Sequence, residues 1–482
     1  MPANTEYLRT RARRFGRSSA WAAAVGAAVL LLGSAARAQD QASGDANAPA
    51  LRLIKLIPIN GTAANRATKM FSFDISWWDP TTGLYFLADR SNAALDVIDT
   101  TGTNTGRCGS TDTGSDTLCG QIGGPGVGFA GDTGTSATSG PNGVTVASPP
   151  SPGTPPIPCI FATDTRNGGR VVSFNYSVSF TTVASSVSTG GTRRADELAF
   201  DPRDNVILAI NNADTPPFGT LISVSPACQL SIVRQIVFNA ANRVNATGGA
   251  EQPVWQGPSA AFPAGKFFVS MPEFDGVASR GGVLQLSASG AVDGIYQVNF
   301  CGPGGLTVGP NGDLLVGCNT VFDTAGDACT AVVATASAFV PAKCTGIANP
   351  QATICNPGRG CTDGALVAVP GVGGGDEVWF NSGDNNYYVT GGNDPIAPVI
   401  GVIASGATST PNTLTQVVPT LYAQQAVGTA GTSSFVHSAG TVHSIAASAA
   451  NNHVYVPLPA NTAYQLNGVG CAQGCVAVFS AQ

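Results

Sequence analysis

Seven positions along the chain share one sequence context and could bring polar side chains together. Each begins a short phrase in which two polar or Gly residues precede an apolar run, as in Asp196-Glu-Leu-Ala-Phe. If the phrases are equivalent in the fold, their first residues converge on one axis although they lie far apart in the chain. These first residues are Asp74, Asn142, Asp196, Glu251, Gly304, Asp376 and His443.

This first column contains four carboxylates, an amide and an imidazole. Like charges held close together repel, and their pKa values rise unless a cation neutralises them. Oxygen-rich sets with one His suit Ca²⁺, Mg²⁺ or Mn²⁺, or Zn²⁺ with mixed ligands. A divalent metal site is therefore one prediction. The alternative is that these residues are solvated groups, or that they cap strands and bond neighbouring repeats. The candidate metal ligands are Asp74, Asn142, Asp196, Glu251, Asp376 and His443.

The second residue of the phrase adds two further acids, Glu197 and Glu377, each in an Asp-Glu pair. A carboxylate beside a metal-bound substrate can move a proton in the reaction. Glu197 and Glu377 are therefore the candidate catalytic residues, either as general bases or as groups behind the metal ligands. Two other catalytic patterns, a Gly-x-Ser-x-Gly elbow and a Walker loop, do not occur in the sequence.

The elements that position these residues follow from the repeat itself. The phrase recurs at intervals of 53 to 72 residues. Most copies continue into a turn and a second apolar strand, as in Asp79-Pro-Thr-Thr-Gly followed by Leu84-Tyr-Phe-Leu. A period of this size with several strands in each unit is typical of a β-propeller. Seven copies predict an all-β, seven-bladed propeller whose inner strands line a channel, with the first column at one end of that channel.

A propeller has to close its ring, and the sequence indicates how. Residues 51–59 are strand-like but precede the first phrase. We expect them to form the outer strand of the last blade, whose inner strands come from residues 443–482. This pairing would protect the edges that an open sheet exposes. The long insertions are predicted to be surface loops. They are residues 101–140, 320–362 and 404–435.

The first 38 residues resemble an export signal. A basic segment from Arg9 to Arg17 precedes an apolar stretch, 20–32, and a small-x-small site at Ala36-Arg-Ala38. The apolar stretch is too short to span a bilayer, and no later segment is apolar enough. We therefore predict a periplasmic or extracellular protein without a membrane span in the mature chain. Its predicted parts are a signal peptide at 1–38, a mature tail at 39–50 and a β-propeller domain at 51–482.

Cysteine content and charge agree with export. The predicted leader holds six Arg and one acidic residue, which leaves 17 basic and 28 acidic residues, a net charge of −11. Such an acidic chain is a poor nucleic-acid binder, because that binding depends on Lys and Arg. An even number of cysteines, 12, indicates disulfides in an exported protein, the alternative being buried thiols. The candidate pairs are Cys108–Cys119, Cys355–Cys361 and Cys471–Cys475 within short loops, and Cys159–Cys228 between neighbouring repeats.

Three phrases resemble known propeller families. Asp196-Glu-Leu-Ala-Phe-Asp-Pro and Gly309-Pro-Asn-Gly-Asp-Leu-Leu-Val resemble secreted seven-bladed propellers of the YncE-like and NHL types. Glu251-Gln-Pro-Val-Trp also resembles the senescence marker protein/gluconolactonase propellers. The latter resemblance implies a six-bladed ring as the alternative fold. It also implies a catalytic divalent metal held by Glu251, Asn142, Asp196 and Asp376.

The two resemblances imply two functions. The first implies an exported binding or scaffold protein that takes a small molecule or a protein at the channel mouth. The second implies a metal-dependent, lactonase-like hydrolase or lyase acting on a small cyclic substrate, in which the metal polarises a carbonyl. A propeller fold does not choose between them. We expect the first function and retain the second as the alternative.

Overall fold

The computed structural model describes residues 50–481. Some residues inside that range are not described. They are Arg66, 105–113, Pro152, Thr154, Asn311, 323–350, 356–366, Gly371, 373–374, 392–398, 407–411, 421–441 and Ala463.

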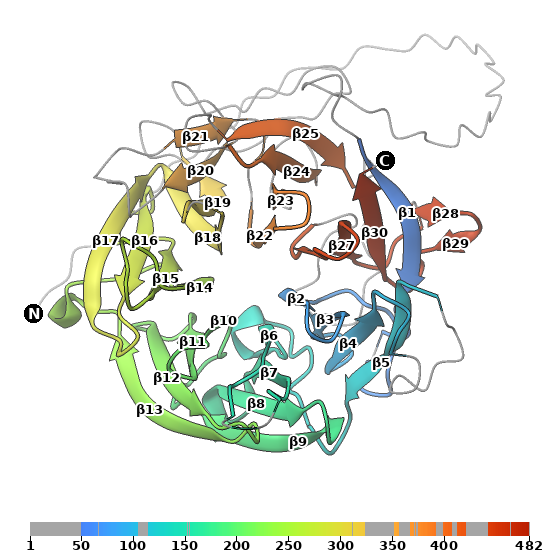
Figure 1. The fold of residues 1–482 in the computed structure, drawn as a ribbon, viewed down its shortest axis with the longest axis horizontal. Coiled ribbons are helices and arrows are strands. Elements are labelled where there is room, and N and C mark those ends of the chain that lie inside the picture. Colours follow the sequence, from blue (N-terminus) through green and yellow to red (C-terminus); the bar gives the residue numbers. More distant parts are fainter. Residues whose placement is uncertain are drawn as a thin grey trace, which may run out of the picture. The chain divides into compact units, whose positions relative to one another are not determined.

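The described strands form seven four-stranded antiparallel sheets, arranged as the blades of a propeller (Figure 1). Six of the sheets are each built from four consecutive strands. Within these six, the first strand lies nearest the centre of the ring and the fourth lies at the rim (Figure 1). The seventh sheet combines strands from both ends of the described chain. The prediction of an all-β propeller is therefore confirmed. If only the six sheets built from consecutive strands are counted, the structure has six blades, which is the predicted alternative. The sheet that combines strands from both ends of the described chain is the seventh sheet of the ring.

The six contiguous sheets follow the chain in order. The first three are β2 (Ser76–Asp79), β3 (Leu84–Asp89), β4 (Ala94–Asp99) and β5 (Thr117–Gly123); β6 (Val144–Ala147), β7 (Cys159–Asp164), β8 (Arg170–Asn175) and β9 (Ser179–Ser188); and β10 (Leu198–Asp201), β11 (Val206–Asn211), β12 (Phe218–Val224) and β13 (Leu230–Val237). The next three are β14 (Pro253–Gln256), β15 (Lys266–Met271), β16 (Arg280–Leu286) and β17 (Val292–Asn299); β18 (Cys301–Val308), β19 (Leu314–Val321), β20 (Gln351–Cys355) and β21 (Val367–Pro370); and β22 (Val378–Asn381), β23 (Asn386–Gly391), β24 (Val399–Ala404) and β25 (Thr413–Pro419).

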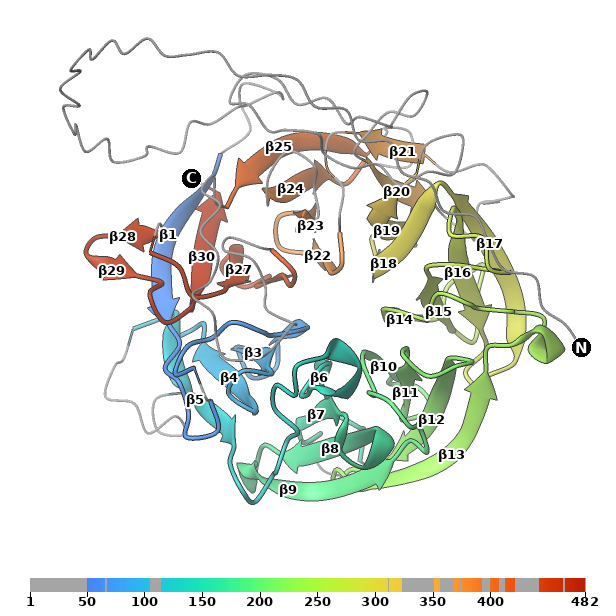
Figure 2. The same ribbon diagram turned by 180° about the vertical axis from the view of Figure 1, so that it is seen from behind.

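The seventh sheet, which we call the closing sheet, has the order β1-β30-β27-β26. Its outer strand β1 runs antiparallel to β30, with Leu51 opposite Ala481 and Pro58 opposite Cys475. Both views of the ring show these two strands side by side (Figures 1 and 2). The predicted closure by the N-terminal strand is thus confirmed. The strands of this region are β1 (Leu51–Pro58), β26 (Ala446–Ala447), β27 (His453–Leu458) and β30 (Cys475–Ala481), with a separate hairpin of β28 (Gln465–Leu466) and β29 (Val469–Gly470).

The apolar core is divided among the wedges between neighbouring sheets. Leu95 of β4 and Phe174 of β8, for example, belong to one fully buried cluster that joins the first two sheets. Tyr388 of β23 and Val454 of β27 belong to the cluster that joins the sixth sheet to the closing sheet. Strands that are buried on both faces read as continuous apolar runs, which explains Leu84-Tyr-Phe-Leu in β3.

Helical structure within the described ranges is limited to three short 3₁₀ turns. They connect strands and do not pack as separate layers. In the part of the chain that is described, no helix has the length and apolar character needed to cross a membrane. The turns are η1 (Ser136–Thr138), η2 (Arg166–Gly168) and η3 (Ala240–Asn242).

Three disulfides are described. Cys159–Cys228 joins β7 to the turn before β13, and Cys471–Cys475 closes the short turn into β30, as predicted. The third, Cys301–Cys318, links β18 to β19 and was not expected from spacing. The other two predicted pairs include Cys108 and Cys361, which lie outside the described residues. Three disulfides indicate an oxidising compartment.

The three predicted surface loops are corrected in part, because each contains a strand. β5 lies within 101–140, β20 within 320–362 and β25 within 404–435. These strands contain Gly, Thr or Gln at positions where an inner strand carries large apolar residues. They form because they pair with a preceding strand, as β25 pairs with β24 over its whole length. Tertiary pairing therefore overrides weak local propensity.

Candidate functional site

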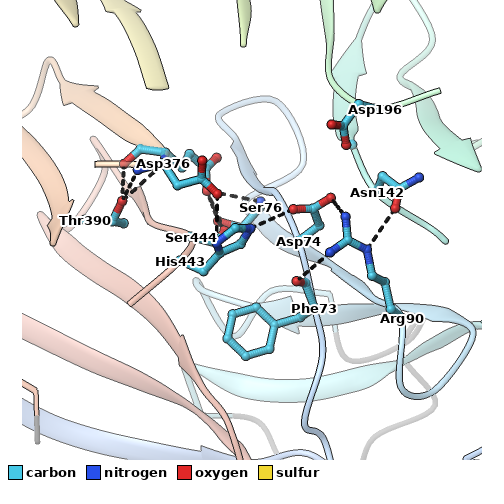
Figure 3. A network of polar contacts seen from close by, with 12 residues as sticks. Phe73, Asp74, Ser76, Arg90, Asn142, Asp196, Asp376, Thr390, His443 and Ser444 are labelled. Carbon is cyan, nitrogen blue, oxygen red and sulfur yellow. Dashed lines mark hydrogen bonds and ion pairs between the residues drawn. The ribbon is translucent and has the colours of Figure 1, made fainter. Parts of the chain in front are cut away.

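The six predicted polar residues of the first column occupy equivalent places in their sheets. Five of them lie two residues before the first strand of a contiguous sheet, and His443 lies three residues before β26. Because these strands surround the channel, their starts bring the side chains to the channel mouth, where contacts join Asp376, His443 and Asp74 and continue through Arg90 to Asn142 (Figure 3). The shared placement predicted from the sequence is therefore found in the structure.

His443 is the link between the first and sixth sheets. Its Nε2 lies 2.8 Å from Asp74 Oδ1, and its Nδ1 lies 2.8 Å from Asp376 Oδ2. Burial lowers the pKa of His443, but the adjacent carboxylates of Asp376 and Asp74 outweigh burial and raise it to about 10. The ring is therefore an imidazolium at neutral pH and donates from both nitrogens. Asn319 Nδ2 donates to the other oxygen of Asp376 at 2.8 Å.

Arg90, a fully buried residue directly after β3, holds the other side of Asp74. Its guanidinium forms an ion pair with Asp74 Oδ2, and its Nε donates to Asn142 Oδ1 at 2.8 Å. Burial alone would raise the pKa of Asp74, but the Arg90 charge and the His443 hydrogen bond hold it well below its usual range. Asp74 is thus a permanent anion between two cations (Figure 3).

Arg194 connects the third and fourth sheets to the same network. Its Nη2 lies 2.7 Å from Asp196 Oδ2, and its Nε donates to Asn212 Oδ1 at 3.0 Å. Asn212 Nδ2 in turn donates to Glu251 Oε2 at 3.0 Å. Burial raises the pKa of Asp196 to about 7, although Arg194 opposes the rise. Burial together with the charge of Asp196 raises the pKa of Glu251 to about 8.

These contacts do not fit the predicted metal site. The described residues include no group of three or more His, Cys, Asp or Glu side chains placed to hold a metal ion. The carboxylates face cationic side chains, since Asp74 contacts Arg90 and His443 while Asp196 contacts Arg194. A metal ion bound among them would lie next to three positive groups. The set of donors therefore fits internal ion pairs better than Ca²⁺, Mg²⁺, Mn²⁺ or Zn²⁺, and no reaction step through a metal is derived.

The two candidate catalytic acids lie deeper, in the seams between sheets. Glu377 is fully buried, and its Oε2 accepts hydrogen bonds from the Ser444 hydroxyl and from the Ile445 amide at 2.8 Å. Burial raises its pKa to about 8, against the effect of these hydrogen bonds. Glu377 therefore links the sixth sheet to the closing sheet. Glu197 is also buried, burial raises its pKa well above its ordinary value, and its Oε2 has no hydrogen-bond partner in the described ranges.

The sequence pattern did not identify four members of this network as site residues. Arg90 and Asn212 occupy a second column, one residue after the second strand of their sheets, and Asn319 lies near the end of the equivalent strand β19. The same column holds Thr165 and Pro272 in other sheets, so no residue type recurs there to mark it. Arg194 lies two residues before Asp196, and its closeness to that phrase was the available signal.

The pKa shift of Glu377 predicts how stability depends on pH. Its folded pKa of about 8 lies above its ordinary value of 4.5, so the folded state binds more protons in this window and is destabilised as pH rises through it. Glu377→Gln should remove that contribution, about 1.4 kcal/mol per pH unit. Urea denaturation at several pH values between 5 and 8 would measure the difference in slope. Glu273→Gln, a surface change, should keep the wild-type slope, and an equal slope in all three proteins would contradict the assignment.

Comparisons with known proteins support the fold only. The chain matches no protein family and no curated protein sequence. Among solved structures it is similar to Kuenenia stuttgartiensis hydrazine synthase, with 11% identity and a TM-score of 0.51 over 82% of this chain and 93% of that chain. It is also similar to the C-terminal WD40 domain of Sif2, with 12% identity and a TM-score of 0.43 over 90% of this chain and 99% of that chain. A third similar structure is a Bacteroides fragilis protein described as a candidate 6-phosphogluconolactonase, with 8% identity and a TM-score of 0.44 over 82% of this chain and 89% of that chain. At such low identity, the likeness to hydrazine synthase establishes the propeller architecture and leaves the activity open.

Proposed function

We propose that this chain is an exported, YncE-like binding protein that takes a small polar molecule at the mouth of its channel. The observation that carries the proposal is the layered construction of the polar network. Arg90 and Asp74, with side chains 0% and 5% exposed, form an inner layer. Arg194, His443 and Asp376, at 13%, 18% and 20%, form an outer layer that the inner residues hold in place.

This construction suits ligand binding because its outer groups are fixed before a ligand arrives. His443 is held by hydrogen bonds to two carboxylates, and Arg194 is held by Asp196 and Asn212. Groups that are already ordered lose little conformational entropy on binding. Because the outer side chains are still about four-fifths buried, a ligand has to extend a narrow polar group into the mouth. A small molecule does this more readily than the flat surface of a protein.

A separate set of observations supports our proposal for the compartment. The three described disulfides require oxidising conditions to persist. The predicted signal peptide at 1–38 supports export to such a compartment. We therefore place the proposed binding function in the periplasm or outside the cell.

Thermal unfolding of the purified mature protein with small polar molecules tests this function. The panel would contain amino acids, sugar acids, polyols and small amines. A ligand that binds only the folded state raises the melting temperature by mass action. We expect at least one class to do so, and Asp376→Asn to weaken its binding about tenfold through loss of one charged hydrogen bond. Asp204→Asn, whose carboxylate is 47% exposed on the surface, is the matched control.

The same assay separates the proposal from the metal-dependent alternative. Ca²⁺, Mg²⁺, Mn²⁺ and Zn²⁺ would be added to metal-stripped protein, with wild type compared with Glu251→Gln. If an ion raises the melting temperature of wild type but not of Glu251→Gln, the lactonase-like hydrolase or lyase becomes the better interpretation. If neither ions nor polar molecules shift it, the mouth is a structural network and the binding function is wrong.

A further inference from the structure

Two seams between neighbouring sheets are bonded in the same way, by the second residue of a phrase. That residue faces the third residue of the next phrase. Gln252 Oε1 accepts a hydrogen bond from the Leu306 amide at 2.6 Å, and Glu377 Oε2 accepts one from the Ile445 amide at 2.8 Å. A side chain with an acceptor oxygen at this position therefore bonds the backbone N–H of the next inner strand.

Glycines at the same position show that the direction is general. A Cβ added at Gly305 would lie 2.8 Å from the Val378 amide nitrogen, the third residue of the next phrase. A Cβ added at Gly143 would clash with the Asp196 carbonyl oxygen and would lie 3.0 Å from the Leu198 side chain, the first and third residues of the next phrase. The backbones approach too closely in those seams for any side chain.

The seam between the third and fourth sheets is different. Glu197 holds the position in its phrase that Gln252 and Glu377 hold in theirs, and the third residue of the next phrase is Pro253. Proline has no backbone N–H and cannot donate. In agreement with this, no described residue donates a hydrogen bond to Glu197 Oε2, although the side chain is only 5% exposed. Glu377 differs in that its Oε2 is paired across the seam, while its Oε1 is also without a described partner. Buried polar groups are normally paired, so an unpaired one calls for an explanation.

One feature of the surroundings indicates where a donor could come from. The next phrase begins with the half-buried Glu251 and Gln252, so this seam borders the open part of the mouth. The missing donor can therefore come from a ligand in the mouth.

We propose that Glu197 binds the ligand of the channel and that the ligand presents a protonated primary amine to it. This inference rests on the proposed binding function and names the chemical class of the ligand. An ammonium group supplies the N–H donors that Pro253 does not, and its positive charge favours the ionised form of the Glu197 carboxyl, which burial disfavours. It also needs no preformed set of metal ligands. Because no described residue donates a hydrogen bond to Glu197 Oε2, the side chain is able to turn an oxygen toward the mouth.

A pair of probes of nearly equal size tests the ligand class. At neutral pH, ethanolamine carries an ammonium group in the place of one of the two hydroxyls of ethylene glycol. Their affinities for the full mature protein would be measured by ligand-observed NMR at equal ionic strength. A charge-assisted hydrogen bond to Glu197 should make ethanolamine bind about tenfold more tightly than ethylene glycol.

Two substitutions then assign the effect to this seam. Glu197→Gln keeps the size of the side chain but removes its charge, and should remove most of the tenfold preference. Pro253→Ala supplies the missing N–H, so that Glu197 bonds the wall as Glu377 does, and should also remove the preference while leaving Glu197 in place. Pro457→Ala, within β27 of the closing sheet, is the matched proline control and should retain the preference.

Each other outcome overturns a specific statement. Equal affinity of the two probes for wild type, or a preference that persists in both Glu197→Gln and Pro253→Ala, would show that Glu197 is paired with water only. If neither probe binds but another member of the polar panel does, the amine class is wrong and the proposed function stands. If a metal ion binds in place of ethanolamine, the metal-dependent alternative becomes the better interpretation of the channel mouth. If no panel member binds, the proposed function fails as well.

Discussion

Replacing Arg90 with Leu should lower the free energy of unfolding by about 3–5 kcal/mol, the usual cost of removing one partner from a buried ion pair. Arg90 is fully buried, and its guanidinium contacts both Asp74 and Asn142. Its loss leaves the Asp74 carboxylate with His443 and a longer 4.0 Å ion pair to Arg194, and leaves the Asn142 oxygen without its donor. Denaturant unfolding followed by circular dichroism would measure the change.

Two further variants make this result specific. Arg203→Leu removes a half-exposed arginine whose Nε lies 3.9 Å from Asp204, and should change stability by less than about 1 kcal/mol. Adding Asp74→Asn to Arg90→Leu should recover part of the loss, because the unpaired buried charge is then gone. If Arg90→Leu costs no more than Arg203→Leu, the guanidinium is not a structural part of the channel mouth.

Deleting residues 51–58 should abolish the stable fold. The strand β1 covers β30, and its Leu51, Leu56 and Ile57 side chains are each less than 5% exposed. Burial of each contributes roughly 1.5–3 kcal/mol, so the three together approach the roughly 5–15 kcal/mol that stabilises a typical protein. The deletion also exposes the edge of β30 to pairing with other chains. We expect loss of the cooperative melting transition, followed by circular dichroism, and larger particles in light scattering.

Point substitutions in the same strand provide the comparison. Leu56→Ala should cost about 2–5 kcal/mol because it leaves a cavity in the wedge beside the sixth sheet. Arg52→Ala, at an exposed position of the strand, should be nearly neutral. A deletion variant that melts cooperatively at the wild-type temperature would show that the closing strand is dispensable.

The repeated phrase made much of this architecture predictable. Because Asp196-Glu-Leu-Ala-Phe and its counterparts begin equivalent strands, their common register is enough to predict six polar residues around the same end of one channel. The closing strand was predictable for a related reason, since an apolar segment ahead of the first phrase has no sheet of its own to join. Both inferences depend on equivalence between repeats, which is visible in a single sequence.

The remainder depends on contacts that the repeat does not encode. Whether guanidinium groups or a metal ion neutralise the channel carboxylates is decided by Arg90 and Arg194, which have no counterpart in most repeats. Outer strands such as β5 and β25 are stabilised by pairing with a neighbour, and their own residues carry little apolar periodicity. The sequence alone does not single out Glu197 and Pro253. Their combination is unusual only in comparison with the seams in which Gln252 and Glu377 accept a hydrogen bond from a backbone N–H of the next phrase.

The closing sheet has a consequence for the order of events during synthesis. β1 is the first strand of the domain to be made, and its partner, β30, is made about 430 residues later. At a synthesis rate of 5–20 residues per second, this separation is roughly 20–90 s. During that interval six sheets can form from neighbouring strands, but β1 has no partner and its hydrogen-bonding edge stays open. Ring closure is therefore the last step of folding, and it closes the longest loop. In the interval before it, the newly made chain is most exposed to misassembly. A chaperone that binds unfolded chains would matter most in that interval.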